Sequence, residues 1–267
     1  MRVMRRLGWR VPILMYHRVL AEGAVDPTGY FFSVPQRRLE QQMRWLKALG
    51  HHVVSLDDIV HWLEGKRRLP SRPVAITFDD GYEDAYRLAA PVLERYRYPA
   101  TFFLIADRLG GWNDWDTPAG TEGYRLIGRD EALDLARRGF TLGSHSRTHR
   151  ELPGLSQKQL RDEVTGSRRS LAQQLGMPVR FFAYPFNITD RRCQNAVRRA
   201  GYHGACAGGG RAYHAFCLDR VDVSRAPLPV FLAKVSPWFH AVRRARACLQ
   251  ERPDARLRAA VAWPPVP

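Results

Sequence analysis

The stretch Pro73-Val74-Ala75-Ile76-Thr77-Phe78-Asp79-Asp80-Gly81 is the most informative part of this chain. Its first six residues form a short, almost continuous apolar run, which predicts a buried strand of a parallel sheet. Asp79 and Asp80 follow at the strand end, where two buried carboxylates are costly unless other groups pair with them. Gly81 then allows a sharp backbone turn. A plain turn with an aspartate helix cap would explain the same pattern.

A second informative segment, Gly143-Ser144-His145-Ser146-Arg147-Thr148-His149, follows another apolar run. We expect His145 and His149 to lie on the first turn of a helix, where residues four apart face the same way. Two imidazoles spaced in this way commonly bind one metal ion. With the carboxylates at residues 79 and 80 they would complete a two-histidine, one-aspartate set with an open position, as catalytic zinc sites need. The alternative is a pair of surface histidines in a polar loop.

Three motifs, in this order along the chain, resemble those of the polysaccharide deacetylases, also called the NodB-homology domain or carbohydrate esterase family four. They are TFDDG at residues 77–81, HSRTH at 145–149 and FAYPFN at 182–187. Weaker similarities are PATFF at 99–103 and ILMYHRV at 13–19. The resemblance covers roughly residues 11–226. It implies a distorted, incomplete (β/α) barrel that removes acetyl groups from glycans.

The resemblance also implies roles for individual residues. Asp79 matches the catalytic base, which takes a proton from the attacking water. Asp80, His145 and His149 match the ligands of a divalent metal, usually zinc, with cobalt or nickel as alternatives. The backbone N–H of Phe186 matches the donor that, together with the metal, holds the tetrahedral oxyanion. The other substrate-contact residues expected from the third motif are Tyr184 and Pro185.

Two positions depart from the family pattern. The third motif usually begins with an arginine that orients the base, but Ala183 occupies that position here. Arg225 is a candidate for this task by default, with a plain surface charge as the alternative. Asn187 replaces a frequent glycine, and asparagine tolerates left-handed backbone angles.

The general acid is also displaced from its usual position. The family commonly has a Leu-x-His triplet near its C-terminal end, whereas His214 and His240 of this chain stand in other contexts. Some family members are circularly permuted, with the last strand moved to the front. His17 follows the strand-like run at residues 11–16, and the first and last strands of a closed barrel are neighbours. We therefore expect His17 to donate a proton to the departing amine, with a structural hydrogen bond as the alternative.

Strand-like and helix-like runs alternate along the chain, which favours an α/β fold with a parallel sheet closed into a barrel. The expected strands are residues 11–16, 52–56, 73–78, 100–105, 140–144, 180–184, 202–205 and 220–224, and the expected helices include 34–49, 82–96 and 157–175. The three motifs fall at strand C-terminal ends, where barrels build active sites. We expect one domain over residues 1–267, with a motif-bearing core at about 11–226 and a basic helical tail at 227–267.

A long loop at residues 110–118 carries Trp112 and Trp115. Long loops over a barrel mouth often contact the substrate, and tryptophan rings stack on the apolar faces of sugars. Both residues could therefore form a saccharide-binding wall. Equally, they could only pin the loop to the surface.

The chain carries 42 basic against 26 acidic residues, a formal net charge of +16. Such a surface favours anionic glycans, phosphate-linked lipid carriers or a membrane face. Nucleic acid would fit the charge as well, but no nucleic-acid motif accompanies it, so we expect no nucleic-acid partner. A bias of the genome towards arginine codons is the neutral explanation.

The four cysteines lack disulfide-framework or metal-binding spacing, which favours reduced thiols. The sequence shows neither a signal peptide nor the run of about 18 apolar residues that spans a bilayer. We therefore expect an enzyme in the cytoplasm or peripherally on the inner face of the membrane. Its substrate would be an acetylated amino-sugar glycan or a lipid-linked saccharide.

The leading hypothesis is metal-dependent hydrolysis of N-acetyl groups from amino sugars. An O-acetyl esterase would use the same residues on a different bond. A catalytically inactive carbohydrate-binding relic of the fold, and a basic protein that binds membranes or nucleic acid, are hypotheses of other classes.

Overall fold

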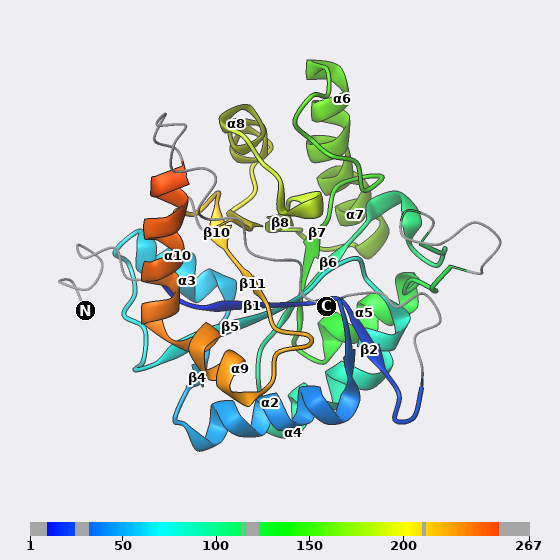
Figure 1. Cartoon of the computed structure of the whole chain (residues 1–267). Helices are drawn as coiled ribbons and strands as arrows, with labels where there is room; N and C mark the ends of the chain where they lie inside the picture. Colours follow the sequence, from blue (N-terminus) through cyan, green and yellow to red (C-terminus); the bar gives the residue numbers. More distant parts are fainter. Residues whose placement is uncertain (1–9, 25–31, 114, 116–122, 210–211, 251–267) are drawn as a thin grey trace.

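The structure, a computed structural model, describes residues 10–24, 32–113, 115, 123–209 and 212–250. Its centre is a parallel sheet to which every main motif is attached (Figure 1). The strands of this sheet are β1 (Ile13–Tyr16), β4 (His52–Val53), β5 (Pro73–Phe78), β6 (Thr101–Leu104), β7 (Thr141–Ser144), β8 (Phe181–Ala183), β9 (Gly204–Ala207), β10 (Leu218–Asp219) and β11 (Val221–Asp222).

The sheet curls into a nearly closed barrel. Its order is β10, β9, β8, β7, β6, β5, β1 and β11, with β4 added beside β5. The two edge strands are almost continuous in sequence, because Arg220 alone separates β10 from β11. Since β10 pairs with β9 and β11 pairs with β1, the segment 218–222 bridges both edges of the sheet.

Alternation along the strands divides the apolar side chains into two layers. The outer layer, under the helices, includes Leu14, Ile76, Phe102 and Phe182. The inner layer fills the barrel and includes Ile13, Ala75, Phe103, Phe181, Ala183 and Cys206. The interior is tight at β7, where a Cβ added to Gly143 would lie 2.4 Å from the Phe103 ring.

Helices surround the barrel (Figure 1). They are α2 (Gln36–Ala48), α3 (Leu56–Leu63), α4 (Ala90–Tyr96), α5 (Arg129–Arg137), α6 (Gln157–Arg161), α7 (Ser167–Leu175), α8 (Arg191–Arg199), α9 (Leu228–Val235) and α10 (Pro237–Gln250). The π-helical turns η1 (Ala85–Ala89) and η3 (Asp162–Gly166) continue into α4 and α7, and the 3-10 turns are η2 (Ala106–Arg108) and η4 (Pro185–Asn187). Beside the barrel, β2 (Arg18–Leu20) and β3 (Ser33–Pro35) pair with each other.

The predicted α/β barrel is confirmed, and all eight expected strands are present. The strand at residues 73–78 has the predicted bounds. The helix expected at 157–175 is continuous through α6, η3 and α7. It begins after a capping box at Ser156 and ends at Gly176, whose φ of 67° suits glycine. The helix expected from residue 34 starts at Gln36 instead, because Ser33–Pro35 pairs with β2.

The basic C-terminal helices pack on the barrel. Phe231 of α9 is fully buried, and its ring centroid lies 5.7 Å from that of Trp45 on α2. His240 of α10 is buried as well. Of the helical tail expected at residues 227–267, α9 and α10 are present as far as Gln250, and the remainder lies outside the described residues. Among the described helices, none combines the length and apolar character needed to cross a bilayer.

Candidate metal centre and active site

Two adjacent aspartates end strand β5 and face different surroundings. Asp79 continues the inward-facing row of Ala75 and Thr77, so its carboxylate lies at the top of the barrel interior. Asp80 has a φ of 68°, which turns its side chain out of the strand pattern. Gly81, with a φ of 74°, continues the turn. Both carboxylates are buried, with exposed fractions of 1% and 2%.

The expected helical turn at His145–His149 is wrong. Residues 145–150 form an irregular loop after β7, in which Ser146 and His149 have φ values of 66° and 64°. Glu163 stabilises the loop by accepting hydrogen bonds from the backbone N–H groups of Arg147 and Thr148 and from the Thr148 hydroxyl. Local left-handed turns, and not helical periodicity, therefore bring the two imidazoles together.

Asp80, His145 and His149 form a buried cluster that could hold a metal ion, as their ligand atoms all lie within 4.8 Å of one another. The Nε2 atoms of both histidines lie 3.3 Å from Asp80 Oδ1. His145 Nδ1 is 2.9 Å from the carbonyl oxygen of Ala183, which fits an Nδ1–H donor and leaves Nε2 free to ligate. Ala183, where the family has an arginine, thus orients a histidine through its backbone.

The donor set fits a divalent cation. Asp80 Oδ1 is buried and has no hydrogen-bond partner among the described residues, although two imidazole nitrogens face it. Burial would raise the pKa of Asp80, but His149 and His145 outweigh burial and hold the pKa well below its ordinary value. An ionised carboxylate between two imidazoles is the set that catalytic zinc sites use.

Arg220 orients Asp79. Its Nη1 and Nη2 atoms donate to the two carboxylate oxygens at 2.5 and 2.6 Å, a bidentate pair inside the barrel. Asn187 Oδ1 accepts from Nη2 at 2.9 Å, and Thr77 Oγ1 accepts from Nη1 at 3.3 Å. Burial would raise the pKa of Asp79, but Arg220, His145 and His17 together lower it, so the carboxylate stays ionised.

The candidacy of Arg225 for this task is therefore wrong. Arg225 is exposed beyond β11, and its backbone carbonyl accepts a hydrogen bond from Arg38. Arg220 was missed although it begins the strand expected at residues 220–224. Its position was a usable signal. A charged residue on the strand that closes the barrel, pointing inward, would need a partner such as the two carboxylates at the end of β5.

His17 lies on the other side of Asp79, directly after β1. Its Nε2 atom is 3.9 Å from Asp79 Oδ2, and its ring stacks on Phe32 with 4.6 Å between centroids. The imidazole is buried, with an exposed fraction of 7% for the residue. The structure thus brings His17 to the same site as the metal cluster, while a general-acid role and a circular permutation stay predictions.

Of the residues expected to contact substrate, the structure places some beside the metal cluster and others away from it. Phe186 is half exposed, has a φ of 56°, and packs its ring against His149 with 4.7 Å between centroids. Trp115 packs on the same imidazole at 4.6 Å. Trp112 is more than half exposed and lies at an isolated bridge to Arg125.

Tyr184 and Pro185 are both buried. The Tyr184 hydroxyl donates to the Phe216 carbonyl oxygen, so this side chain points away from the cluster. Asn187 has a φ of 58°, as its tolerance for left-handed angles allows. Its contact with Arg220 gives it a positioning task that the sequence did not reveal.

A second group of histidines and a carboxylate, made of His61, Glu64 and His203, also has ligand atoms within 4.8 Å of one another. It lies where α3 ends and β9 begins, at the opposite end of the barrel from Asp80. Unlike the first cluster it is partly exposed, and Glu64 pairs with Lys66 at 2.9 Å. The buried cluster is therefore the stronger candidate for a metal centre.

Comparisons with known proteins agree with this geometry. A family model described as "Polysaccharide deacetylase" matches residues 66–205, just over half of the chain. YxkH of Bacillus subtilis is 27% identical over 219 residues, which cover 80% of this chain and 72% of YxkH. The poly-β-1,6-N-acetyl-D-glucosamine N-deacetylase of Staphylococcus aureus is 26% identical over 206 residues, covering 70% of this chain and 68% of that enzyme.

The fold has close structural relatives as well. The structure of IcaB from Ammonifex degensii superposes with a TM-score of 0.71 at 25% identity, covering 85% of this chain and 97% of IcaB. The matched family range contains the Asp79–Asp80 pair and both cluster histidines.

Proposed function

The chain belongs to the polysaccharide deacetylase family, and on this premise we propose that it hydrolyses N-acetyl groups of amino sugars in a glycan, with one divalent metal ion as cofactor. The observation that carries the proposal is the adjacency of two units. One is the buried Asp80, His145 and His149 cluster, and the other is the Asp79–Arg220 pair beside it.

The metal would be held by Asp80 Oδ1 and the Nε2 atoms of His145 and His149, and zinc is the ion we propose. When bound, such an ion polarises the amide carbonyl and lowers the pKa of a water molecule. The open side of the cluster is lined by the rings of Trp115 and Phe186, which limit access of bulk water.

The proton transfers fall to two residues on opposite flanks of the site. Asp79, kept ionised and fixed in orientation by Arg220, accepts the proton of the water that attacks the carbonyl carbon. The backbone N–H of Phe186 donates to the oxyanion that develops. His17 then protonates the departing amine, so that acetate and a free amino sugar are formed.

The Staphylococcus aureus relative, a poly-β-1,6-N-acetyl-D-glucosamine N-deacetylase, supports an N-acetyl substrate. The same residues could cleave an O-acetyl ester, which needs no strong general acid because an alcohol leaves more readily than an amine. The buried His17 beside Asp79 therefore favours amide hydrolysis.

Acetate release from N-acetylglucosamine oligomers tests the proposal. Zinc-loaded wild type should release acetate, whereas Asp79→Asn should retain stoichiometric zinc and lose turnover, because it lacks only the base. Asp130→Asn, which removes a carboxylate that is 97% exposed on α5, is the matched control and should behave as wild type.

Other outcomes would replace the proposal. Equal acetate release by wild type and Asp79→Asn would exclude Asp79 as the base. Zinc binding without release from any N-acetyl or O-acetyl substrate would favour a non-catalytic carbohydrate-binding protein.

A further inference from the structure

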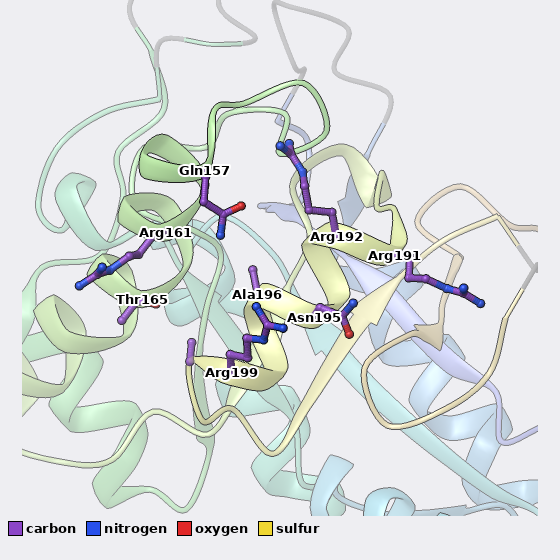
Figure 2. Close-up of a pocket in the computed structure, with 9 residues that line it drawn as sticks. Gln157, Arg161, Thr165, Arg191, Arg192, Asn195, Ala196 and Arg199 are labelled. Carbon is purple, nitrogen blue, oxygen red and sulfur yellow. The ribbon is translucent and has the colours of Figure 1, made fainter.

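A groove lined by arginine lies between α6 and α8, outside the site described above (Figure 2). It encloses about 580 Å³, and four of its nine lining residues are arginines while none is acidic. The lining residues are Gln157, Arg161, Thr165, Arg191, Arg192, Asn195, Ala196, Arg199 and Ala200. Gln157 and Arg199 extend into the space between the helices, whereas the side chains of Arg161 and Arg191 leave its two flanks and point outward (Figure 2).

Most of the positive charge of this groove has no neutralising partner among the described residues. Several exposed arginines elsewhere pair with carboxylates, as Arg67 does with Asp58 and Arg147 with Asp107. In the part of the chain that the structure describes, Arg161, Arg191 and Arg199 have no carboxylate partner. The lining of the groove therefore carries positive charge without a matching carboxylate, and such a surface attracts an anion.

The backbone under the groove is held in place. Arg192 Nη2 donates to the carbonyl oxygen of Leu155 at 2.6 Å, which ties the start of α8 to the loop before α6. Gln157, Arg161 and Thr165 also line a second hollow. Its other charged lining residues are Lys158, Arg169 and the acidic Asp162, so the surface along α6 and η3 stays basic on balance. The polar side chains of Gln157, Thr165 and Asn195 add uncharged hydrogen-bonding groups.

The groove is connected to the candidate active site through the chain. The loop that carries His149 leads into α6, and the η4 turn that carries Phe186 leads into α8. The His149 and Phe186 rings are in contact, with 4.7 Å between their centroids. Each wall of the groove therefore continues along the chain into one of two loops that meet on the face of the barrel where its strands end.

We propose that this groove binds phosphate groups carried by the glycan substrate, next to the site of deacetylation. Arginine suits phosphate because its planar fork donates two parallel hydrogen bonds to phosphate oxygens. Several arginines around one hollow match a group with more than one negative charge, such as a diphosphate or closely spaced phosphodiesters. The proposal rests on the proposed function, since it names the class of glycan that the same enzyme would take.

Kinetics with matched substrates test the inference. The substrates are an N-acetylglucosamine pentamer, the same pentamer with a diphosphate at its reducing end, and a pentamer with an internal phosphodiester. Metal-loaded wild type should show a KM at least about tenfold lower for a phosphorylated pentamer than for the neutral one, because two charge-assisted contacts are added. The preferred phosphorylated pentamer identifies a diphosphate carrier or a phosphodiester polymer as the source.

The double variant Arg161→Gln/Arg199→Gln should abolish this preference while leaving kcat and KM for the neutral pentamer unchanged. The matched control is Arg37→Gln/Arg44→Gln, which removes the same charge from exposed positions on α2, across the molecule from α6 and α8 (Figure 1). The control should keep the preference. Equal loss in both double variants would mean that net charge is responsible, and would overturn the groove assignment.

A binding measurement separates failure of this inference from failure of the proposed function. Inorganic pyrophosphate titrated into metal-loaded wild type should bind more weakly to Arg161→Gln/Arg199→Gln than to the α2 control. Deacetylation of the neutral pentamer without any phosphate preference would refute the groove and leave the proposed function standing. Pyrophosphate binding that depends on Arg161 and Arg199, without deacetylation of any pentamer, would support the groove and refute the proposed function. If a pentamer that carries a uronic acid in place of phosphate lowered KM by the same factor, the assignment to phosphate would be refuted.

Discussion

At the residue scale, the proposed mechanism depends most on the bidentate pair between Arg220 and Asp79. A general base acts only if its oxygen is aimed at the water, and Arg220 is in turn aimed by Thr77 and Asn187. In the proposed mechanism Arg220 is a positioning residue, because it contacts Asp79 and not the candidate metal ligands. The third motif has Ala183 where the resemblance implies an orienting arginine, and the contact to Asp79 comes instead from Arg220, between β10 and β11.

Replacing Arg220 by lysine should lower kcat about 100-fold, because one ammonium cannot reproduce the two-point contact and small misplacements of a base are costly. KM and zinc content should change little, since the cluster ligands are untouched. Arg220→Gln should also destabilise the fold by about 3 kcal/mol or more, as Asp79 would be left as an unpaired buried charge. Steady-state kinetics, zinc analysis and denaturant unfolding check these results.

Two outcomes would contradict the positioning role of Arg220. One is an unchanged kcat in Arg220→Lys. The other is a loss of zinc that parallels the loss of rate, which would place Arg220 in metal binding instead. Arg225→Lys, at the exposed position expected from sequence, is the control and should have wild-type kinetics.

Removing a cluster ligand should remove the metal. His149→Ala deletes one of the two imidazoles facing Asp80, so the variant should lose tight zinc binding, and acetate release should fall to background. His203→Ala alters the partly exposed group at the other end of the barrel and should keep one tightly bound zinc and full activity. Calorimetric zinc titration of both apoproteins shows which of the two groups binds the metal. Tight zinc retained by His149→Ala but lost in His203→Ala would place the metal at the second group.

The sequence predicted which residues meet at the site better than how they meet. Asp80, His145 and His149 come together as expected, yet the helical turn assumed for the histidines is absent. Left-handed angles at Ser146 and His149 depend on Glu163, whose contact with this loop spans 15 or more residues. No local pattern encodes such a contact. The partner of Asp79 was missed for a similar reason, because Arg220 lies 141 positions away and only its place on the strand that closes the barrel pointed to it.

At the element scale, helix α8 joins the third motif to the arginine groove, and its start depends on one cap. Asp190 accepts a 2.7 Å hydrogen bond from the Cys193 N–H. Burial would raise the pKa of Asp190, but the bonds from Cys193 and the nearby Arg192 outweigh it and lower the pKa. A carboxylate whose pKa is lowered by folding stabilises the native state above its unfolded pKa of about 4.

Asp190→Ala should cost about 1 kcal/mol at neutral pH, the usual effect of deleting a helix cap. Asp190→Asn keeps an acceptor and should cost less. The difference between wild type and Asp190→Asn should shrink as the pH falls below about 4 and through the lowered pKa of the folded state, because Asp190 then becomes neutral as well. Urea unfolding at several pH values measures this. A difference that grew on acidification would contradict the capping role of the charge.

The bounds of elements with strong local sequence signals were predicted well. The bounds of elements that depend on which strands pair in the sheet were not. Strand β5 is apolar throughout and flanked by turn residues, so its bounds were predictable. Helix α6 to α7 has a capping box at one end and glycine at the other. In contrast, only β11 lies within the strand expected at 220–224, and β10 before it was not expected. The chain changes partner from β9 to β1 at Arg220. A change of partner has no local sequence signal.

At the scale of the whole molecule, the segment that closes the barrel is also where both ends of the described chain meet. Asp219 is buried, and it accepts hydrogen bonds from Arg10, before β1, and from Arg243 of α10. Arg243 also donates to the Arg220 carbonyl oxygen, and Lys234 of α9 donates to that of Asp222. The backbone that presents Arg220 to Asp79 is therefore braced from outside the barrel, which couples closure of the fold to the geometry of the site.

A core ending at residue 226, as the sequence suggested, should consequently be unstable and inactive. Truncation after Ala226 removes Phe231 and Val235 from the core and the braces from residues 219–222, at a cost of several kcal/mol by the usual value of buried side chains. We expect a Tm lower by about 10 °C or more and a larger loss of kcat than of zinc binding.

Phe231→Ala should reproduce part of this loss, whereas Trp238→Ala, at a side chain that is 80% exposed, should not. Scanning calorimetry and acetate release compare the truncated chain and the two substitution variants with wild type. A truncated chain with the Tm and kcat of wild type would show that α9 and α10 are a dispensable appendage, and that β10 and β11 close the barrel without them.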